Sequence, residues 1–431
     1  MLLIYTHKIT PRLSYIMRHL FTKILGVEIG FTTKVEEFIK HSGPKITYTR
    51  QPLQNEFFVR SNDLLFEQGI NDVQMNVADW EGTPCFFNTD ERSNVPFDVF
   101  AASFYLLSRY EEYLPHVKDI HGRFSPKDSV AYQHNFLHKP VVDIWTYKLF
   151  ALLQERFPDL QGKQRNYAFT SLLDVTTSHC YSHRGVVRGL SGLALDLGTF
   201  KIRRVVDRLA VWFKIRKDPY DNFSQLLTWH KEYNIKSIFF FQFADYSKYD
   251  KNVSINNNRF KSLIKYIADY SIVALAASYT SFNNEQILKK EKTNLEAVIN
   301  RSVSSSRMRY NRVDVPETYR KLIAAEFTDD YTMGYSHEIG FRAGTCTPFS
   351  FYDIPLEIQQ PIKVHPFAVH DYALSALKRQ GEVLLRLSLV YDEVKKVHGH
   401  FMTVFSNELL GSSERLEWKT IYKSVLKDYH V

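Results

Sequence analysis

Apolar runs of strand length alternate with helical patterns in the later part of this chain, and this alternation constrains the fold most. The runs YAFTSLLDV (167–175), KSIFFFQF (236–243) and SIVALAASYT (271–280) are continuously apolar over most of their length. Amphipathic helical patterns lie between them, as in 259–270. Buried strands separated by helices are typical of βαβ units. The sequence therefore predicts an α/β fold around a parallel sheet or barrel.

The earlier part of the chain is built from shorter pieces. Residues 8–25 have apolar positions at helical spacing, with Thr10 as a plausible N-cap and Pro11 at the first helical position. Further helices are expected over 96–115 and 142–157, among short strand-like runs. These features are typical of an α+β or an α/β arrangement built from small pieces.

A polar stretch, PDLQGKQRN at 158–166, is the best candidate for a domain boundary. At 431 residues the chain is long enough for two domains. We therefore expect a smaller α+β domain over 1–160 and a larger domain over 168–431.

Composition excludes several classes of protein. A hydrophobic content of 44% argues against extended disorder. Cys85, Cys180 and Cys346 lie far apart, so they form neither a disulfide framework nor a CxxC zinc signature. The apolar start MLLI is too short for a signal peptide, and no uncharged run is long enough for a membrane span. We expect a cytoplasmic protein with no membrane span.

The net charge is +8, and the charged residues are spread along the chain; the densest basic stretch is KIRRVVDRLAVWFKIRK, residues 201–217. Because apolar residues are interleaved with the basic ones, we interpret the basic residues of this stretch as the solvated face of an amphipathic segment. A basic surface for nucleic acid or another partner is the alternative.

Few residues outside this stretch suggest chemistry by themselves. Asp174 stands at the end of an apolar strand, where catalytic groups of α/β barrels lie, although an aspartate there is also a common turn residue. His179 and His183, in HCYSH, would share one face of a helix and could form a zinc site with Asp174 and Cys180.

The segment GFRAGTCTPFSFYD, residues 340–353, predicts a tight loop that carries Arg342. That arginine could bind an anionic or polyhydroxyl ligand in a cleft, or it could brace the loop itself. The chain has no P-loop, GxGxxG or GxSxG motif, so nothing in the sequence supports nucleotide binding or serine hydrolysis.

Several longer segments together resemble the polysaccharide deacetylase family, also called the NodB-homology or carbohydrate esterase family four fold. The resemblance covers about residues 168–425, and its most specific segments are DYTMGY (330–335) and GFRAGTCTPF (340–349). FDVFAASFYLLSRYEEYLP and HGRFSPKDS, in the first part, resemble a branch of the family with an extra N-terminal domain. The resemblance implies an irregular (β/α) barrel.

The resemblance also implies an activity, the removal of acetyl groups from sugars. In that family a divalent metal, commonly zinc, is held by one aspartate and two histidines and activates water. A second aspartate acts as general base, and a histidine late in the chain acts as general acid.

Most of these residues are replaced in this chain. Asp174 keeps the base position, but the metal-binding aspartate corresponds to Thr176. The histidine positions correspond to Ala276 and Thr280, and the acid position corresponds to Ser406. Since catalytic zinc needs about three protein ligands, these replacements predict the loss of the metal site.

Two further sets of residues follow from the resemblance. Arg307 is followed by Met308 and Arg309 where related sequences place a histidine or glutamine. The residues expected to shape a substrate cleft are Tyr279, Arg342, Thr345 and His365. A structural role is the alternative for His365.

The sequence therefore predicts a deacetylase homologue that has lost metal-dependent hydrolysis and binds an acetylated glycan or serves as a scaffold, with no cofactor. One alternative is an active deacetylase whose rebuilt site holds zinc or another divalent metal on Asp174, His179 and His183. The other is the basic surface for nucleic acid or a partner, for which steeply salt-dependent binding is expected. The sequence leaves the sugar and the oligomeric state open.

Overall fold

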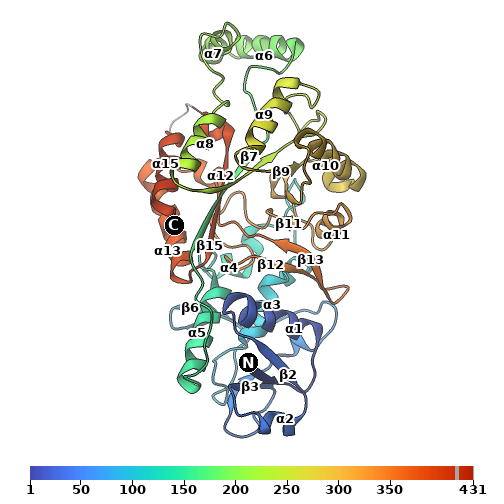
Figure 1. The fold of residues 1–431 in the computed structure, drawn as a ribbon, viewed down its shortest axis with the longest axis vertical. Helices are drawn as coiled ribbons and strands as arrows, with labels where there is room; N and C mark the ends of the chain where they lie inside the picture. The colour runs from blue at the N-terminus through green and yellow to red at the C-terminus, as the bar shows by residue number, and fades with distance from the viewer. Residues whose placement is uncertain (413–416, 431) are drawn as a thin grey trace.

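Two parallel sheets organise the chain, one in each half (Figure 1). The computed structural model describes residues 1–412 and 417–430. Within these residues no helix has the length and apolar character needed to cross a bilayer.

The first sheet has four strands in the order β2-β1-β3-β4. Its strands are β1 (Leu2–Tyr5), β2 (Ile29–Thr32), β3 (Lys45–Thr49) and β4 (Phe57–Arg60). All neighbouring pairs are parallel, which differs from the α+β domain expected over 1–160 and agrees with the α/β alternative. The short period-2 runs predicted strands but carried no signal for their direction. The next two strands in the sequence, β5 (Ala78–Trp80) and β6 (Thr83–Cys85), form a separate antiparallel pair.

The helices of the first half begin largely where their caps predict. Thr10 accepts a hydrogen bond from the Leu13 N–H and starts α1 (Pro11–Met17), which continues as a π-helix, η1 (Arg18–Ile24). The remaining helices are α2 (Val35–Lys40), α3 (Val99–Leu107), α4 (Val130–Gln133) and α5 (Val141–Arg156). The helix expected over 96–115 ends early because Arg109 adopts a left-handed backbone with φ of 57°.

The second sheet has nine strands in the order β12-β13-β11-β10-β9-β8-β7-β15-β14. The strands are β7 (Ala168–Val175), β8 (Lys236–Phe241), β9 (Ile272–Ala277), β10 (Ser305–Met308), β11 (Asp329–Asp330), β12 (Phe349–Asp353), β13 (Ile358–Val364), β14 (Val369–His370) and β15 (His400–Ser406). Every pair is parallel except β12 with β13. Over the described residues the sheet has two edges, β12 and β14, so it is open where an irregular (β/α) barrel was expected. β14 is only two residues long and pairs with β15 alone.

Helices connect the strands of the second sheet and cover it. They are α6 (Val186–Gly198), α7 (Ile202–Trp212), α8 (Phe223–Glu232), α9 (Asn258–Ala268), α10 (Glu285–Ile299), α11 (Glu317–Ala324), α12 (Asp371–Ser375), α13 (Gln380–Lys396), α14 (Asn407–Leu410) and α15 (Trp418–Tyr429). Figure 1 shows α6 and α7 at the end of the molecule opposite the first sheet.

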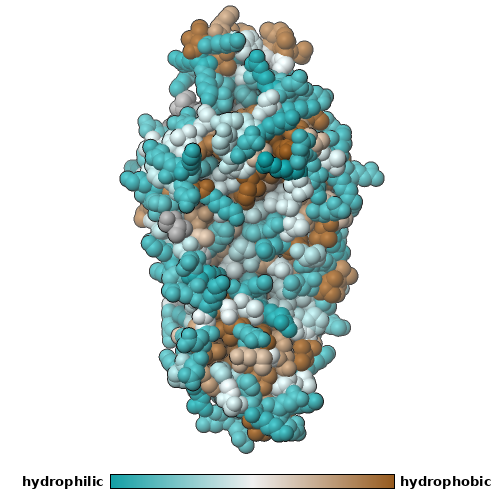
Figure 2. Space-filling model, in the orientation of Figure 1, coloured by the Kyte–Doolittle hydropathy of each residue, from teal (hydrophilic) through white to brown (hydrophobic). Residues whose placement is uncertain are grey.

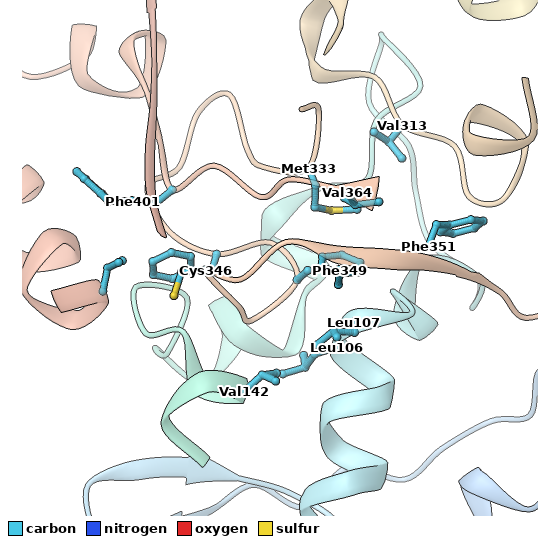
Figure 3. Close-up of a cluster of buried hydrophobic side chains, with 14 of the residues drawn as sticks. Leu106, Leu107, Val142, Val313, Met333, Cys346, Phe349, Phe351, Val364 and Phe401 are labelled. Carbon is cyan, nitrogen blue, oxygen red and sulfur yellow. The ribbon is translucent and has the colours of Figure 1, made fainter. Parts of the chain in front are cut away.

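One hydrophobic core joins the two halves. Figure 3 shows Leu106 and Val142 of the first half beside Phe349 and Phe351 of the second, all within one continuous cluster of buried side chains. The polar stretch 158–166 therefore separates the halves in sequence while their cores are continuous.

Candidate functional site

A cavity of about 300 Å³ opens at the carboxyl ends of the central strands of the second sheet. Parallel strands place their carboxyl ends at one edge, and the register pairs Ser406 with Asp174 and Arg307 with Ala276. The lining residues are His121, Arg123, Asp174, Thr176, Ala276, Arg307, Met308, Arg309, Tyr310, Asn311, Ser336, His337, His370, Asp371, Tyr372, Ser406 and Glu408. The predicted base, two of the three positions implied for the metal, and the acid position therefore meet in one place.

Asp174 is held by a buried arginine at the floor of this cavity. The Nε atom of Arg307 lies 2.9 Å from Oδ1 and 3.1 Å from Oδ2 of Asp174. Arg307 is 2% exposed and also donates to the Tyr331 carbonyl oxygen at 2.7 Å. Its guanidinium carbon lies 4.6 Å from the ring centroid of Phe367. A fixed positive charge therefore already balances the carboxylate that was predicted to act as base.

A histidine that the sequence argument missed lies beside this pair. His370 Nε2 is 3.9 Å from Asp174 Oδ2, and His370 Nδ1 is 2.9 Å from Asp371 Oδ1. The other oxygen of Asp371 accepts hydrogen bonds from the Ser406 amide and hydroxyl, each at 2.7 Å. Burial raises the pKa of Asp371, but His370 and Ser406 outweigh burial and hold that pKa below its usual value. Ser406, at the implied acid position, thus serves to anchor an aspartate.

The three positions implied for a metal do not offer a ligand set. The Thr176 hydroxyl donates to a Glu408 carboxylate oxygen, and Ala276 has no donor atom. The Thr280 hydroxyl donates to Asp250 at 3.0 Å. In the described part of the chain, no group of three or more His, Cys, Asp or Glu side chains could hold a metal ion. These residues do not fit the divalent metal that the resemblance implies.

His179 and His183 lie away from this cavity. Their segment follows β7 as turns and bends, with His183 at φ of 62°, so the helical spacing assumed for them is wrong. Their rings are perpendicular neighbours with centroids 4.9 Å apart, and His179 Nδ1 contacts the Ser178 hydroxyl at 3.1 Å. Neither histidine is among the residues that line the cavity with Asp174. A zinc site on these three residues therefore lacks the required convergence.

Arg342 joins the two halves of the chain. Its Nε and Nη2 atoms bond Glu112 at 2.8 and 2.6 Å, and all these atoms are buried. Arg109 bonds the same carboxylate at 2.7 Å and also donates to the Arg342 carbonyl oxygen. Arg342 is therefore not part of the lining of the 300 Å³ cavity, although it lines a smaller cavity of about 100 Å³ that shares Ser336 and His337 with it.

Thr345 and His365 also lie outside the cavity lining. The Thr345 hydroxyl is fully buried and donates to Asp143 at 2.6 Å, across the same junction. His365 stacks on Tyr331 with centroids 4.2 Å apart, and its Nε2 is 2.7 Å from Asp329. Burial lowers the pKa of His365 although Asp329 opposes that effect. These contacts give His365 the structural role that was its alternative.

Tyr279 belongs to an aromatic cluster at the rim of the cavity. Its ring lies 4.2 Å from Tyr249 and 5.5 Å from Tyr310, centroid to centroid. Tyr310 in turn stacks on His121 at 4.7 Å, and His121 and Tyr310 both line the cavity. Tyr279 thus supports the lining rings from behind.

The first half of the chain completes the cavity wall. His121 comes from the loop between α3 and α4, and Arg123, two residues later, donates to the Tyr310 carbonyl oxygen at 3.0 Å. Burial and the nearby Arg123 lower the pKa of His121, which favours its neutral form. The segment HGRFSPKDS marks this loop in the sequence. Nothing in the segment indicates that the loop contacts the second sheet.

The first half of the chain matches one family model. A family model described as a family of unknown function (DUF7033) matches residues 2–158. No curated protein matches the chain. Solved structures with some similarity include a protein described as a polysaccharide deacetylase from Mycobacterium smegmatis, at 13% identity and a TM-score of 0.41, which covers 62% of this chain and 84% of that one.

Two further structures are similar at the same level. Puue allantoinase is 11% identical with a TM-score of 0.39, covering 61% of this chain and 84% of that one. A protein described as a polysaccharide deacetylase from Pseudomonas aeruginosa PAO1 is 12% identical with a TM-score of 0.38, covering 61% and 85%. The function of this chain is therefore inferred from its own residues.

Proposed function

We propose that this chain binds an acetylated glycan in the cavity at the carboxyl ends of the second sheet and does not deacetylate it by a metal-dependent mechanism. The observation that carries the proposal is the Asp174–Arg307 pair, at 2.9 Å, in a cavity whose metal positions carry Thr176 and Ala276. The base position is kept, but its charge is balanced by the protein itself.

Carbohydrate is the ligand class that the lining favours. A sugar ring presents an apolar C–H face to aromatic rings and a rim of hydroxyl groups to planar polar side chains. The rings of Tyr310 and Tyr372 line the cavity, and so do the planar polar groups of Arg309 and Glu408. Its volume of about 300 Å³ lies at the lower end of the range for small-molecule sites, which suits a short segment of a glycan.

Loss of hydrolysis follows from the chemistry of the remaining groups. Catalytic zinc takes about three protein ligands, and a threonine hydroxyl and an alanine methyl cannot replace carboxylate and imidazole. Ser406 cannot protonate a leaving group as an imidazolium can, and its hydroxyl already donates to Asp371 at 2.7 Å. A scaffold role without any ligand is the competing possibility that the experiment has to separate.

Binding should be measured by titration calorimetry with acetylated chito-oligosaccharides and with their fully deacetylated counterparts. We expect saturable binding of the acetylated series. Tyr310→Ala should weaken that binding about 3- to 10-fold, because one stacking surface is lost. Tyr270→Ala is the matched control, since Tyr270 is 68% exposed and lies outside the cavity lining.

A deacetylase assay with added zinc, run beside Asp174→Asn, tests the second half of the proposal. We expect no acetate release from the wild-type chain. Metal-dependent release that disappears in Asp174→Asn would overturn the loss of hydrolysis. An absence of any glycan binding, with the wild type folded, would instead favour the scaffold role.

A further inference from the structure

The helical hairpin formed by α6 and α7, residues 186–217, stands apart from the cavity and from both sheets. It is inserted between β7 and β8 and forms the far end of the molecule in Figure 1. We call this segment the hairpin. Its surface has a composition unlike that of the remaining chain.

Exposed apolar side chains are concentrated on the hairpin. Among the described residues, 26 large hydrophobic side chains are exposed, and ten of them belong to it. Phe200, in the turn between the helices, is 86% exposed, and Ile215 is 77% exposed. Figure 2 shows brown side chains gathered at this end of the molecule. Such a density of exposed apolar surface marks an interaction site.

The apolar residues follow the helical period on each helix. Val186, Leu190, Leu193 and Leu197 recur at i, i+4, i+7 and i+11 on α6. Ile202, Val206, Leu209 and Phe213 recur at the same spacing on and just beyond α7. Each helix therefore presents one continuous apolar stripe.

Polar side chains lie in the contact between α6 and α7. In a helical hairpin exposed to water, apolar side chains would normally fill this contact. Asp196 and Arg208 form an ion pair at 2.5 Å, and both residues are buried. Gly189 and Gly192 let the Trp212 ring and the Arg208 guanidinium approach, since a Cβ atom at either glycine would lie 2.8 Å from them. One ion pair thus lies inside the hairpin while many of its apolar side chains lie outside, which differs from the usual distribution in water.

The hairpin is also strongly basic. It contains eight Lys and Arg residues against two Asp, so it carries a net charge of +6 out of the +8 of the whole chain. Five arginines line a cavity of about 540 Å³ between the hairpin and the body of the molecule: Arg184, Arg203, Arg204, Arg208 and Arg216. The partner of this surface must therefore be both anionic and apolar.

We propose that the hairpin docks on the surface of an anionic phospholipid bilayer, with its apolar stripes at the acyl boundary and its basic side chains at the lipid phosphates. This is the arrangement of an interfacial amphipathic helix pair. The helices, of 13 and 11 residues, are too short to span a bilayer.

Other partners match only part of this surface. Nucleic acid would neutralise the charge but leave the apolar stripes in water. A second copy of the chain would cover apolar area, but it would bring two surfaces of +6 together. An anionic bilayer satisfies both properties at once.

The test is vesicle flotation of the full chain, with phosphatidylcholine alone and with phosphatidylcholine mixed with phosphatidylglycerol. We expect flotation with the mixed vesicles only, weakened by added salt. The triple variant Lys201→Gln, Lys214→Gln, Lys217→Gln should weaken binding on the order of 100-fold. The variant Phe200→Ser, Ile202→Ser should weaken it about tenfold or more.

The matched control is Leu385→Ser with Leu389→Ser, which removes exposed apolar residues of α13, 59% and 50% exposed, and should leave flotation unchanged. The proposal would be overturned if the wild type did not float with the mixed vesicles, or if the hairpin variants floated as well as the wild type. It would also be overturned if light scattering showed that the wild type is a dimer and that Phe200→Ser, Ile202→Ser is a monomer. Salt-sensitive binding to DNA without binding to vesicles would assign the charge to nucleic acid instead.

Discussion

Glu112 and Arg342, 230 residues apart in sequence, form a buried bidentate ion pair across the junction between the two halves of the chain. Burial raises the pKa of Glu112, but the charges of Arg342 and Arg109 outweigh burial and lower that pKa to about 2. The carboxylate therefore stays ionised throughout the physiological range. The pair positions the halves that together line the cavity.

We expect Glu112→Gln to destabilise the protein by about 3–5 kcal/mol, because the change leaves the buried Arg342 without its counter-charge and Arg109 with Glu111 alone. The free energy of unfolding from urea titrations measures the effect. Lys289→Gln, which breaks the exposed pair of Lys289 with Glu285, is the control and should change stability by less than about 1 kcal/mol. Equal effects of the two changes would contradict the role given to Glu112.

Because of Glu291, we expect the free energy of unfolding to fall as the pH rises. It is 4% exposed, and burial raises its pKa to about 7 although hydrogen bonds from Ser278 oppose the shift. A carboxyl group with a raised pKa binds its proton more tightly in the folded chain. The stability that Glu291 contributes is therefore fully present below its pKa in the unfolded chain, near 4.3, and is lost as the pH rises through its pKa in the folded chain, about 7.

The measurement for Glu291 is a comparison of urea unfolding at pH 5 and pH 8 for the wild type and Glu291→Gln. The amide stays neutral, so the variant should lose less stability over this range, with a difference of up to about 3 kcal/mol. Burial also raises the pKa values of Asp98 and Asp330 to about 6. Because both residues are present in the wild type and in the variant, their effect on stability cancels in the comparison. Parallel pH profiles of the two proteins would show that Glu291 is not the group responsible.

Gly344 should not tolerate a side chain. Its φ is +64°, and an added Cβ atom would lie 2.7 Å from Leu106 Cδ1 at the junction. We expect Gly344→Ala to cost about 2–4 kcal/mol from backbone strain and overpacking together. Gly69→Ala, at φ of +72° with no atom within 4 Å, isolates the backbone part and should cost about 1 kcal/mol. Thermal or urea unfolding measures both, and similar losses would remove the packing argument.

Metal chelation should leave the protein unchanged. Since Asp174 is paired with Arg307, and Thr176 with Glu408, we expect EDTA to leave the melting temperature unaltered. We also expect elemental analysis of the purified protein to find far less than one zinc per chain. Stoichiometric zinc that is lost in Asp174→Asn would show that the ligand set has been misassigned.

The sequence predicted the parts of the site that depend on one strand at a time. Continuous apolar runs are distinctive, so β7, β8 and β9 and the position of Asp174 at a strand end could be predicted. Parallel packing then brings Thr176 and Ala276 to the same edge, where both line the cavity.

Contacts between distant segments could not be predicted from one sequence. Arg307 is 133 residues from Asp174, and either residue alone has many possible partners. His121 reaches the cavity from the first half through an irregular loop, which has no periodic pattern to reveal its course. For Arg342, the glycine-rich segment leaves two roles open, ligand binding in a cleft and bracing of the loop. The glycines permit close packing, since Gly344 lies against Leu106 and Gly340 against Leu137.

The continuous core described for Figure 3 bears on how such a chain can evolve. Where two domains meet through a small polar interface, recombination can exchange either one for another. Here Leu106 and Val142 of one half belong to the same buried cluster as Phe349 and Phe351 of the other. A half transplanted into another protein would lose part of its own interior, so we expect the two halves to be inherited together, with substitutions in one compensated by substitutions in the other.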